Sequence, residues 1–161
     1  MLECFKKRPF MWANHVWNMF DFAADARNQG GEPGMNHKGL VTFDRKLKKD
    51  SFYLYKAYWN KQPMVHIAGK RYAYRPEKVT QVQVYTNCDS VTLYADGKPV
   101  AEKKSTVSGG KVFTFRVTLG DSTKIEAVAG NVRDEATLSF TPDPVSAYKL
   151  NKKTAGGGNW T

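Results

Sequence analysis

Residues 64–140 alternate between apolar and polar side chains in short stretches, the pattern of half-buried β-strands. Thr80–Thr86 alternates most cleanly, and Val112–Leu119 is rich in the β-branched and aromatic residues that favour strands. Further strands are expected at 64–67, 72–74, 91–95, 124–129 and 136–140. Asp96-Gly97 favours the tight turn of a β-hairpin, because both residues tolerate positive φ. About seven short strands separated by turns predict an immunoglobulin-like β-sandwich.

The residues before this region follow a different pattern. Met11–Phe22 is continuously apolar and aromatic, as a parallel strand buried on both faces would be. Ala23–Met35 predicts a loop from its glycines and proline, and Leu40–Phe43 is a second short apolar run. Asp50 can cap a helix over Ser51–Trp59 by accepting the first free backbone N–H groups. Aromatic side chains form one packing stripe on that helix, namely Phe52, Tyr55, Tyr58 and Trp59.

Composition narrows the classes of function. The chain has 161 residues, of which 41% are hydrophobic, enough for a folded core. The net charge is +10, but Lys and Arg are spread along the chain without interleaved stacking aromatics, so no nucleic-acid binding is expected. No apolar run approaches the roughly 18 residues of a membrane span. The first residues show no signal-peptide pattern, and the compartment is not predicted.

Three motifs in the first part occur in an order that resembles a known enzyme family. They are Val16–Phe22, the loop Asn36–Val41 followed by Asp44-Arg45, and the aromatic helix Phe52–Trp59. This order resembles the last strand, active-site loop and last helix of the (β/α)₈ barrel in glycoside hydrolase family 2, which contains β-galactosidases and β-glucuronidases. The stretches from Val82 to Lys98 are similar to the all-β domain that follows the barrel in bacterial members.

The resemblance implies a mainly β fold class: an immunoglobulin-like β-sandwich preceded by a truncated β/α remnant of the barrel. Residues 1–62 would be the end of the catalytic barrel, 63–142 the sandwich, and 143–161 a linker or tail. A complete barrel needs about 250 residues, so the chain is expected to be a fragment of a longer exo-β-glycosidase. The basic run that follows Asp44 looks more like that of galactosidase-like members, so β-galactosidase is preferred and β-glucuronidase is the alternative.

The family hydrolyses β-glycosides with two carboxyl groups about 5 Å apart. In family members these are glutamates on the fourth and seventh barrel strands, ahead of the segment matched here. The resemblance therefore implies that this chain holds no catalytic residue and is inactive alone. Asp21 and Asp25 lie near the motif, but Asp21 matches a position that is not the nucleophile, and nothing fixes Asp25.

Trp17 is the first expected substrate-binding residue. In the family, the tryptophan at this place lies under the sugar next to the scissile bond. A flat indole suits the apolar face of a pyranose, and its N–H can serve a hydroxyl. The alternative is core packing, because Trp12 and several phenylalanines lie nearby in the sequence.

Asn36 and Lys38 are the second candidates, as Asn-x-Lys before Gly39. In β-glucuronidases of the family this triplet binds the carboxylate of the sugar. An ammonium and an amide can share one anionic group, and the glycine allows a close approach. Two alternatives remain, because galactosidase-like members carry a similar run, and because a turn asparagine beside an exposed lysine is ordinary in loops.

No cofactor or metal site is predicted. His15 and His37 lack ligand partners at metal-binding spacing, and His66 lies in a strand, where a structural role is expected. Cys4 and Cys88 are far apart and form no metal or redox motif. The Gly-rich stretches lack the Gly-Lys-Ser/Thr ending of phosphate loops.

The expected partner is a carbohydrate, a β-galactoside or β-glucuronide. Self-association through the apolar surface of the barrel remnant is a further expectation, because exposed apolar patches associate. The rival hypothesis is a carbohydrate-binding or structural sandwich. Its sugar platform would consist of exposed aromatic side chains such as Tyr72, Tyr74, Tyr85 and Tyr94.

Overall fold

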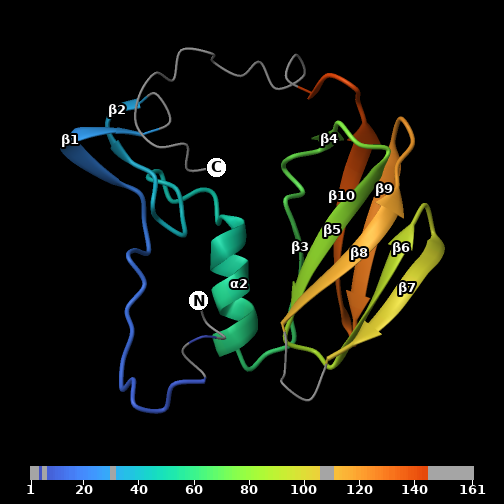
Figure 1. Cartoon of the computed structure of the whole chain (residues 1–161), viewed down its shortest axis with the longest axis horizontal. Coiled ribbons are helices and arrows are strands. Elements are labelled where there is room, and N and C mark those ends of the chain that lie inside the picture. The colour runs from blue at the N-terminus through green and yellow to red at the C-terminus, as the bar shows by residue number, and fades with distance from the viewer. Residues whose placement is uncertain (1–3, 5–6, 30–31, 106–110, 145–161) are drawn as a thin grey trace. The chain divides into compact units, whose positions relative to one another are not determined.

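A computed structural model describes residues 4, 7–29, 32–105 and 111–144 (Figure 1). The chain divides into two compact units, the first ending at Lys48 and the second beginning at Lys49. The mainly β fold class is confirmed. The domain boundaries expected from the sequence, at residues 62 and 142, remain a prediction, and the expected tail lies almost entirely outside the described residues.

Two β-sheets make up the second unit. The three-stranded sheet has the order β3 (Val65–Ala68), β5 (Val79–Thr86), β8 (Val112–Thr118), and all its pairs are antiparallel. The five-stranded sheet has the order β4 (Tyr74–Arg75), β10 (Val132–Phe140), β9 (Thr123–Ala129), β6 (Ser90–Ala95), β7 (Lys98–Lys104). Only the β10–β4 pair is parallel.

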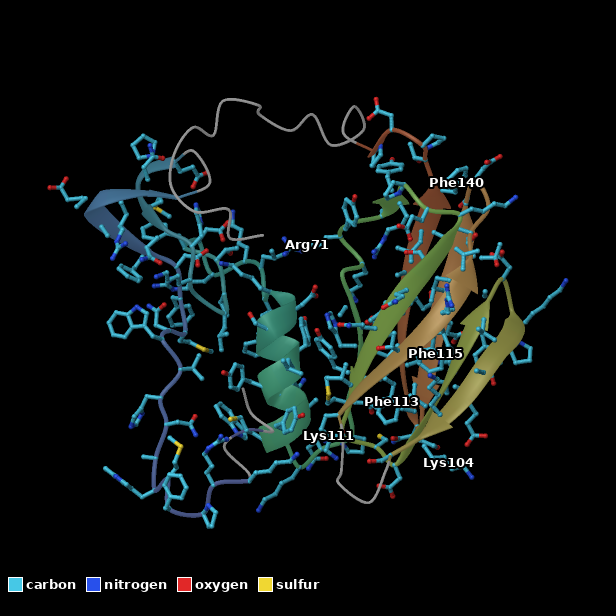
Figure 2. The ribbon with its side chains drawn as sticks, in the orientation of Figure 1. Arg71, Lys104, Lys111, Phe113, Phe115 and Phe140 are labelled. Carbon is cyan, nitrogen blue, oxygen red and sulfur yellow. The ribbon has the colours of Figure 1, made fainter. Side chains whose placement is uncertain are left out.

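One apolar core lies between the two sheets, as in a β-sandwich. Each strand supplies alternate side chains to it, so that Val82 and Val84 of β5 are buried while Gln81 and Gln83 are exposed. Phe113 and Phe115 of β8 belong to the core (Figure 2). The other buried members are Ile67, Val91, Leu93, Val117, Leu119, Ile125, Ala127, Ala129 and Leu138.

The predicted hairpin after β6 is also present. Asp96 and Gly97 both have positive φ, and β6 pairs with β7 on either side of them. Strand β7 is an edge of the five-stranded sheet. Its residues are mostly exposed and include Lys98, Lys103 and Lys104.

The predicted helix is α2 (Asp50–Trp59), which packs on the outer face of the three-stranded sheet. The ring of Tyr53 stacks on that of His66 in β3, with 3.7 Å between centroids. The predicted cap is wrong, because Asp50 is the first helical residue and Lys49 precedes it without a side-chain cap. The Asp50 carboxylate instead accepts bonds from His66 Nε2 at 2.9 Å and Gly69 N–H at 2.7 Å. These distant partners replace the local backbone as its hydrogen-bond donors.

The first unit contains a two-stranded antiparallel sheet of β1 (Phe22–Gln29) and β2 (Glu32–Asn36). The loop expected over residues 23–35 is therefore wrong, since most of this segment pairs with itself.

The buried strand expected over residues 11–22 is also wrong. Only residues 18–21 run beside 39–41, through a parallel bridge between Phe20 and Val41 and three backbone hydrogen bonds of 2.9–3.0 Å. Trp12 is 95% exposed and Trp17 is 73% exposed. Most of this segment is exposed in the described part of the chain, whereas burial on both faces requires cover from several directions.

The core should respond strongly to truncation. Leu93 is fully buried between the sheets, so Leu93→Ala should lower the free energy of unfolding by about 2–5 kcal/mol. The matched substitution Val100→Ala, on the exposed edge strand β7, should cost about 0.5 kcal/mol or less. Urea unfolding followed by circular dichroism measures both. Equal shifts in the midpoint would contradict the sandwich core described above.

Candidate functional site

A buried carboxylate anchors the loop that carries the candidate sugar-binding residues. Asp21 is 2% exposed, and its Oδ1 accepts the Gly39 N–H at 2.8 Å. The two backbones approach so closely that a Cβ on Gly39 would collide with the Asp21 backbone nitrogen. Only glycine fits at this position, and the bond to Asp21 holds the loop beside residues 18–21.

His37 links the same loop to strand β2. Its Nδ1 lies 3.5 Å from Asp21 Oδ2, and its Nε2 lies 3.0 Å from Glu32 Oε2. Asp21 lies 16 residues before His37 in the sequence, and Glu32 lies 5 residues before it. A local spacing pattern therefore did not indicate either contact. No group of side chains suited to hold a metal ion occurs among the residues that the structure describes.

Asn36 shapes the turn that presents Lys38. The Asn36 side chain is buried, and its Oδ1 accepts the Lys38 backbone N–H at 3.0 Å. This is an Asx-turn, in which a side-chain oxygen mimics a backbone carbonyl. Lys38 itself is exposed. A contact of either residue with a sugar remains a prediction.

Trp17 lies at the same end of the site. Leu40 N–H donates to the Asn18 carbonyl at 3.0 Å, and the two stretches run parallel. Trp17 and Lys38 therefore both precede this pairing, at one end of it. The indole makes an edge-to-face contact with Phe22, with 6.1 Å between ring centroids. Its exposure argues against the core-packing alternative within this unit.

Asn18, next to Trp17, carries a second polar group at this place. Its Oδ1 is buried and has no hydrogen-bond partner among the described residues. The Trp17–Asn18 peptide bond is cis. A buried amide oxygen without a partner is uncommon in proteins, and neither the composition nor the periodicity of the sequence singled it out.

The second unit contains a cleft of about 270 Å³ on the outer face of the three-stranded sheet. It was not predicted from the sequence. The residues that line it are Asp50, Ala68, Gly69, Arg75, Gln81, Gln83 and Tyr85. Burial alone would raise the pKa of Asp50, but the hydrogen bonds from His66 and Gly69 outweigh it and lower that pKa below 3.8.

His66 joins this cleft to the five-stranded sheet. The imidazole is almost fully buried between two carboxylates, Asp50 at 2.9 Å and Asp134 Oδ2 at 3.5 Å. Asp134 also accepts Lys70 Nζ at 2.7 Å and the Ile67 N–H at 2.8 Å. The structural role expected for His66 agrees with these bonds.

Several known proteins are similar to this chain. A family model described as a domain of unknown function (DUF4982) matches residues 77–132. A β-glucuronidase of Bacteroides fragilis is 39% identical over 141 residues, which are 85% of this chain and 20% of the relative. No helix in the described parts of the chain is long and apolar enough to cross a membrane.

Two solved structures extend the comparison. An FMN-binding β-glucuronidase from Facaelibacterium prausnitzii L2-6 is 51% identical, with a TM-score of 0.82, over 88% of this chain and 22% of that one. A putative β-galactosidase from Bacteroides fragilis is 33% identical, with a TM-score of 0.80, over 87% of this chain and 22% of that one. The chain spans about a fifth of the length of these relatives.

The hydrogen bonds of Asp50 should make the second unit sensitive to acid. Its folded-state pKa is lowered, so the stabilisation is complete above the unfolded-state value of about 3.9. It is lost as the pH falls through the folded-state pKa. Asp50→Asn should therefore flatten the decrease in unfolding free energy between about pH 5 and pH 2.5.

Asp121→Asn is the matched control, because Asp121 is exposed and outside the cleft. It should keep the slope of the unchanged protein. Urea unfolding across this pH range is the measurement. An Asp50→Asn slope equal to that of the unchanged protein would contradict the assignment.

Proposed function

We propose, from the homology of this chain to the C-terminal region of family 2 glycoside hydrolases, that it supplies one wall of the substrate pocket of a retaining exo-β-glycosidase. The catalytic carboxyl groups would come from another part of that enzyme. The observation that carries the proposal is the parallel pairing that brings Trp17 and the 36–39 loop to one end.

Each candidate residue would have a distinct role. The exposed indole of Trp17 offers a flat apolar surface for a pyranose ring. The Lys38 ammonium would pair with an anionic group of the sugar. Asn36 would act mainly by holding the turn, because its Oδ1 already accepts the Lys38 N–H. Asp21, through Gly39, would fix the distance between the loop and the tryptophan.

The substrate that we propose is a β-glucuronide. The basic run after Asp44 favours a β-galactoside, with the glucuronide as the alternative. The relatives named above favour the alternative, since two of the three are named as β-glucuronidases. A lysine at the mouth of the loop also suits a carboxylate better than a neutral hydroxymethyl group.

A second candidate function is binding of FMN, because the relative that is 51% identical to this chain is named as FMN-binding. The second unit has side chains of suitable chemistry. Arg75 can pair with a phosphate, and the amides of Gln81 and Gln83 can meet the polar edge of a ring system. Bound flavin would bring a redox-active ring, and the residues of this chain would hold it in place.

Hydrolysis can be tested in a chimaera, in which this chain replaces the matching segment of the Facaelibacterium prausnitzii enzyme. Lys38→Ala should lower kcat/KM on nitrophenyl β-glucuronide by about tenfold or more, because a charge-assisted bond is lost. Activity on nitrophenyl β-galactoside should change little. Trp17→Ala should lower activity on both substrates.

Lys46→Ala is the matched control, since Lys46 is an exposed lysine a few residues along the same segment. It should leave both activities unchanged. The isolated chain should hydrolyse neither substrate. Turnover by the isolated chain that a substitution in it abolishes would overturn the proposed division of roles.

FMN binding is checked by titrating the full chain into FMN and following flavin fluorescence. Saturable quenching is the expected result, because an aromatic ring or a polar site changes the flavin environment on binding. Riboflavin, which lacks the phosphate, should bind at least about tenfold more weakly. No saturable change up to millimolar protein would remove this candidate.

A further inference from the structure

The cleft of the second unit faces away from the sandwich core. Gln81, Gln83 and Tyr85 occupy alternate positions of β5, and the residues between them point into the core. Ala68 of β3 pairs with Gln83, which brings the end of β3 to the same face. Helix α2 covers the neighbouring His66 and leaves this part of the sheet open. The floor is thus a row of two amides and one aromatic ring.

Arg75 supplies a positively charged wall held from two sides. Its Nη2 donates to the Gly69 carbonyl at 2.9 Å, and its guanidinium lies 5.0 Å from the ring centroid of Tyr72. A guanidinium fixed in this way loses little conformational entropy when it pairs with a ligand. The planar guanidinium geometry suits the two oxygens of a carboxylate or a phosphate.

The one carboxylate of the cleft is already bound. Asp50 accepts bonds from His66 and Gly69, and the charge of Arg71 acts on it as well. Arg116 adds a further positive charge beside the cleft, because it pairs with Gln81 across β5 and β8. The balance of charge around the cleft is positive and favours an anion.

Tyr85 completes the floor with a neutral hydroxyl. Burial raises its pKa, and the nearby Asp50 charge raises it further. The phenol therefore stays protonated at neutral pH and can donate or accept a hydrogen bond. Its ring, together with the two glutamine amides, matches a ligand that presents both hydroxyls and an apolar face.

We infer that this cleft binds a small hydroxylated organic anion, either a uronic acid or a sugar phosphate. Its volume of about 270 Å³ is several times the roughly 30 Å³ of one water molecule, so a ligand of monosaccharide size fits. Arg75 holds the anionic group, and Gln81, Gln83 and Tyr85 meet the hydroxyls. The inference rests on the second unit alone and goes beyond the sugar pocket proposed for the first.

The test is an amide NMR titration of the full chain with glucuronate, ribose 5-phosphate and galactose. Binding of a ligand this small is expected at about millimolar Kd. One or both anions should shift the amide resonances of Gly69, Gln81 and Gln83, and galactose should not. Shifts with glucuronate alone identify a carboxylate ligand, and shifts with ribose 5-phosphate alone identify a phosphate ester. Shifts with both identify a site that accepts either anion. No saturable shift with either anion, or equal shifts with galactose, would overturn the inference.

Variants then locate the site. Arg75→Gln should weaken anion binding about tenfold. Because Arg75 also holds Gly69, a second variant is needed, and Gln81→Ala with Gln83→Ala changes only exposed positions. It should weaken binding about threefold or more. The matched control Arg133→Gln removes the same charge from an exposed position on β10 and should leave binding unchanged.

Two outcomes of the variant series count against the cleft. If Arg133→Gln weakens binding as much as Arg75→Gln, the anion is held by overall charge and not by this site. If the double glutamine variant and Arg75→Gln both bind as the unchanged protein does, the ligand lies elsewhere. If FMN still binds to both variants, FMN binding remains a candidate function but this cleft is not its site.

Discussion

The contact between Asp21 and Gly39 is the constraint on which the candidate sugar site depends. Backbone atoms of residues 20–21 occupy the space that any side chain at position 39 would need. The buried Asp21 carboxylate is compensated by the Gly39 N–H and by His37. A charge in such a place is tolerated only when it is hydrogen-bonded. The loop position is therefore set by one carboxylate and one missing Cβ, and the side chains of Trp17 and Lys38 follow from it.

In the second unit, the two faces of the three-stranded sheet have different roles. The inner face of β5 contributes Val82 and Val84 to the core, and its outer face carries the amides of the cleft. Asp50 connects these roles, because it fixes the start of α2 to β3 and also lines the cleft. The stability of the sandwich and the shape of the cleft are consequently linked through a single carboxylate.

Local periodicity was enough to predict most of the sandwich. In strands buried on one face, such as β5 and β8, apolar and polar residues alternate clearly. The Asp96-Gly97 pair strongly favours a tight turn. Prediction failed where partners lie far apart in the sequence. Asp50 resembles a helix cap in the sequence. Its donors His66 and Gly69 lie too far along the chain for a local pattern to indicate them. The apolar run at 11–22 has the composition of a buried strand, although only its last residues, 18–22, pair with another part of the chain.

The sequence also indicated one of the two candidate sites and not the other. Trp17, Asn36 and Lys38 remain predictions from a family-like order of motifs, and the structure adds Asp21 and His37 as supports of the loop. The cleft was missed because Gln81 and Gln83 resemble the solvent face of any strand.

The lysines of β7 limit the pairing of the five-stranded sheet with strands of other molecules. Pro99 offers no N–H, and three lysines lie on the same edge strand. Charged or very short margins prevent a sheet from recruiting a strand of another molecule. The five-stranded sheet is thereby protected against edge-to-edge pairing along β7.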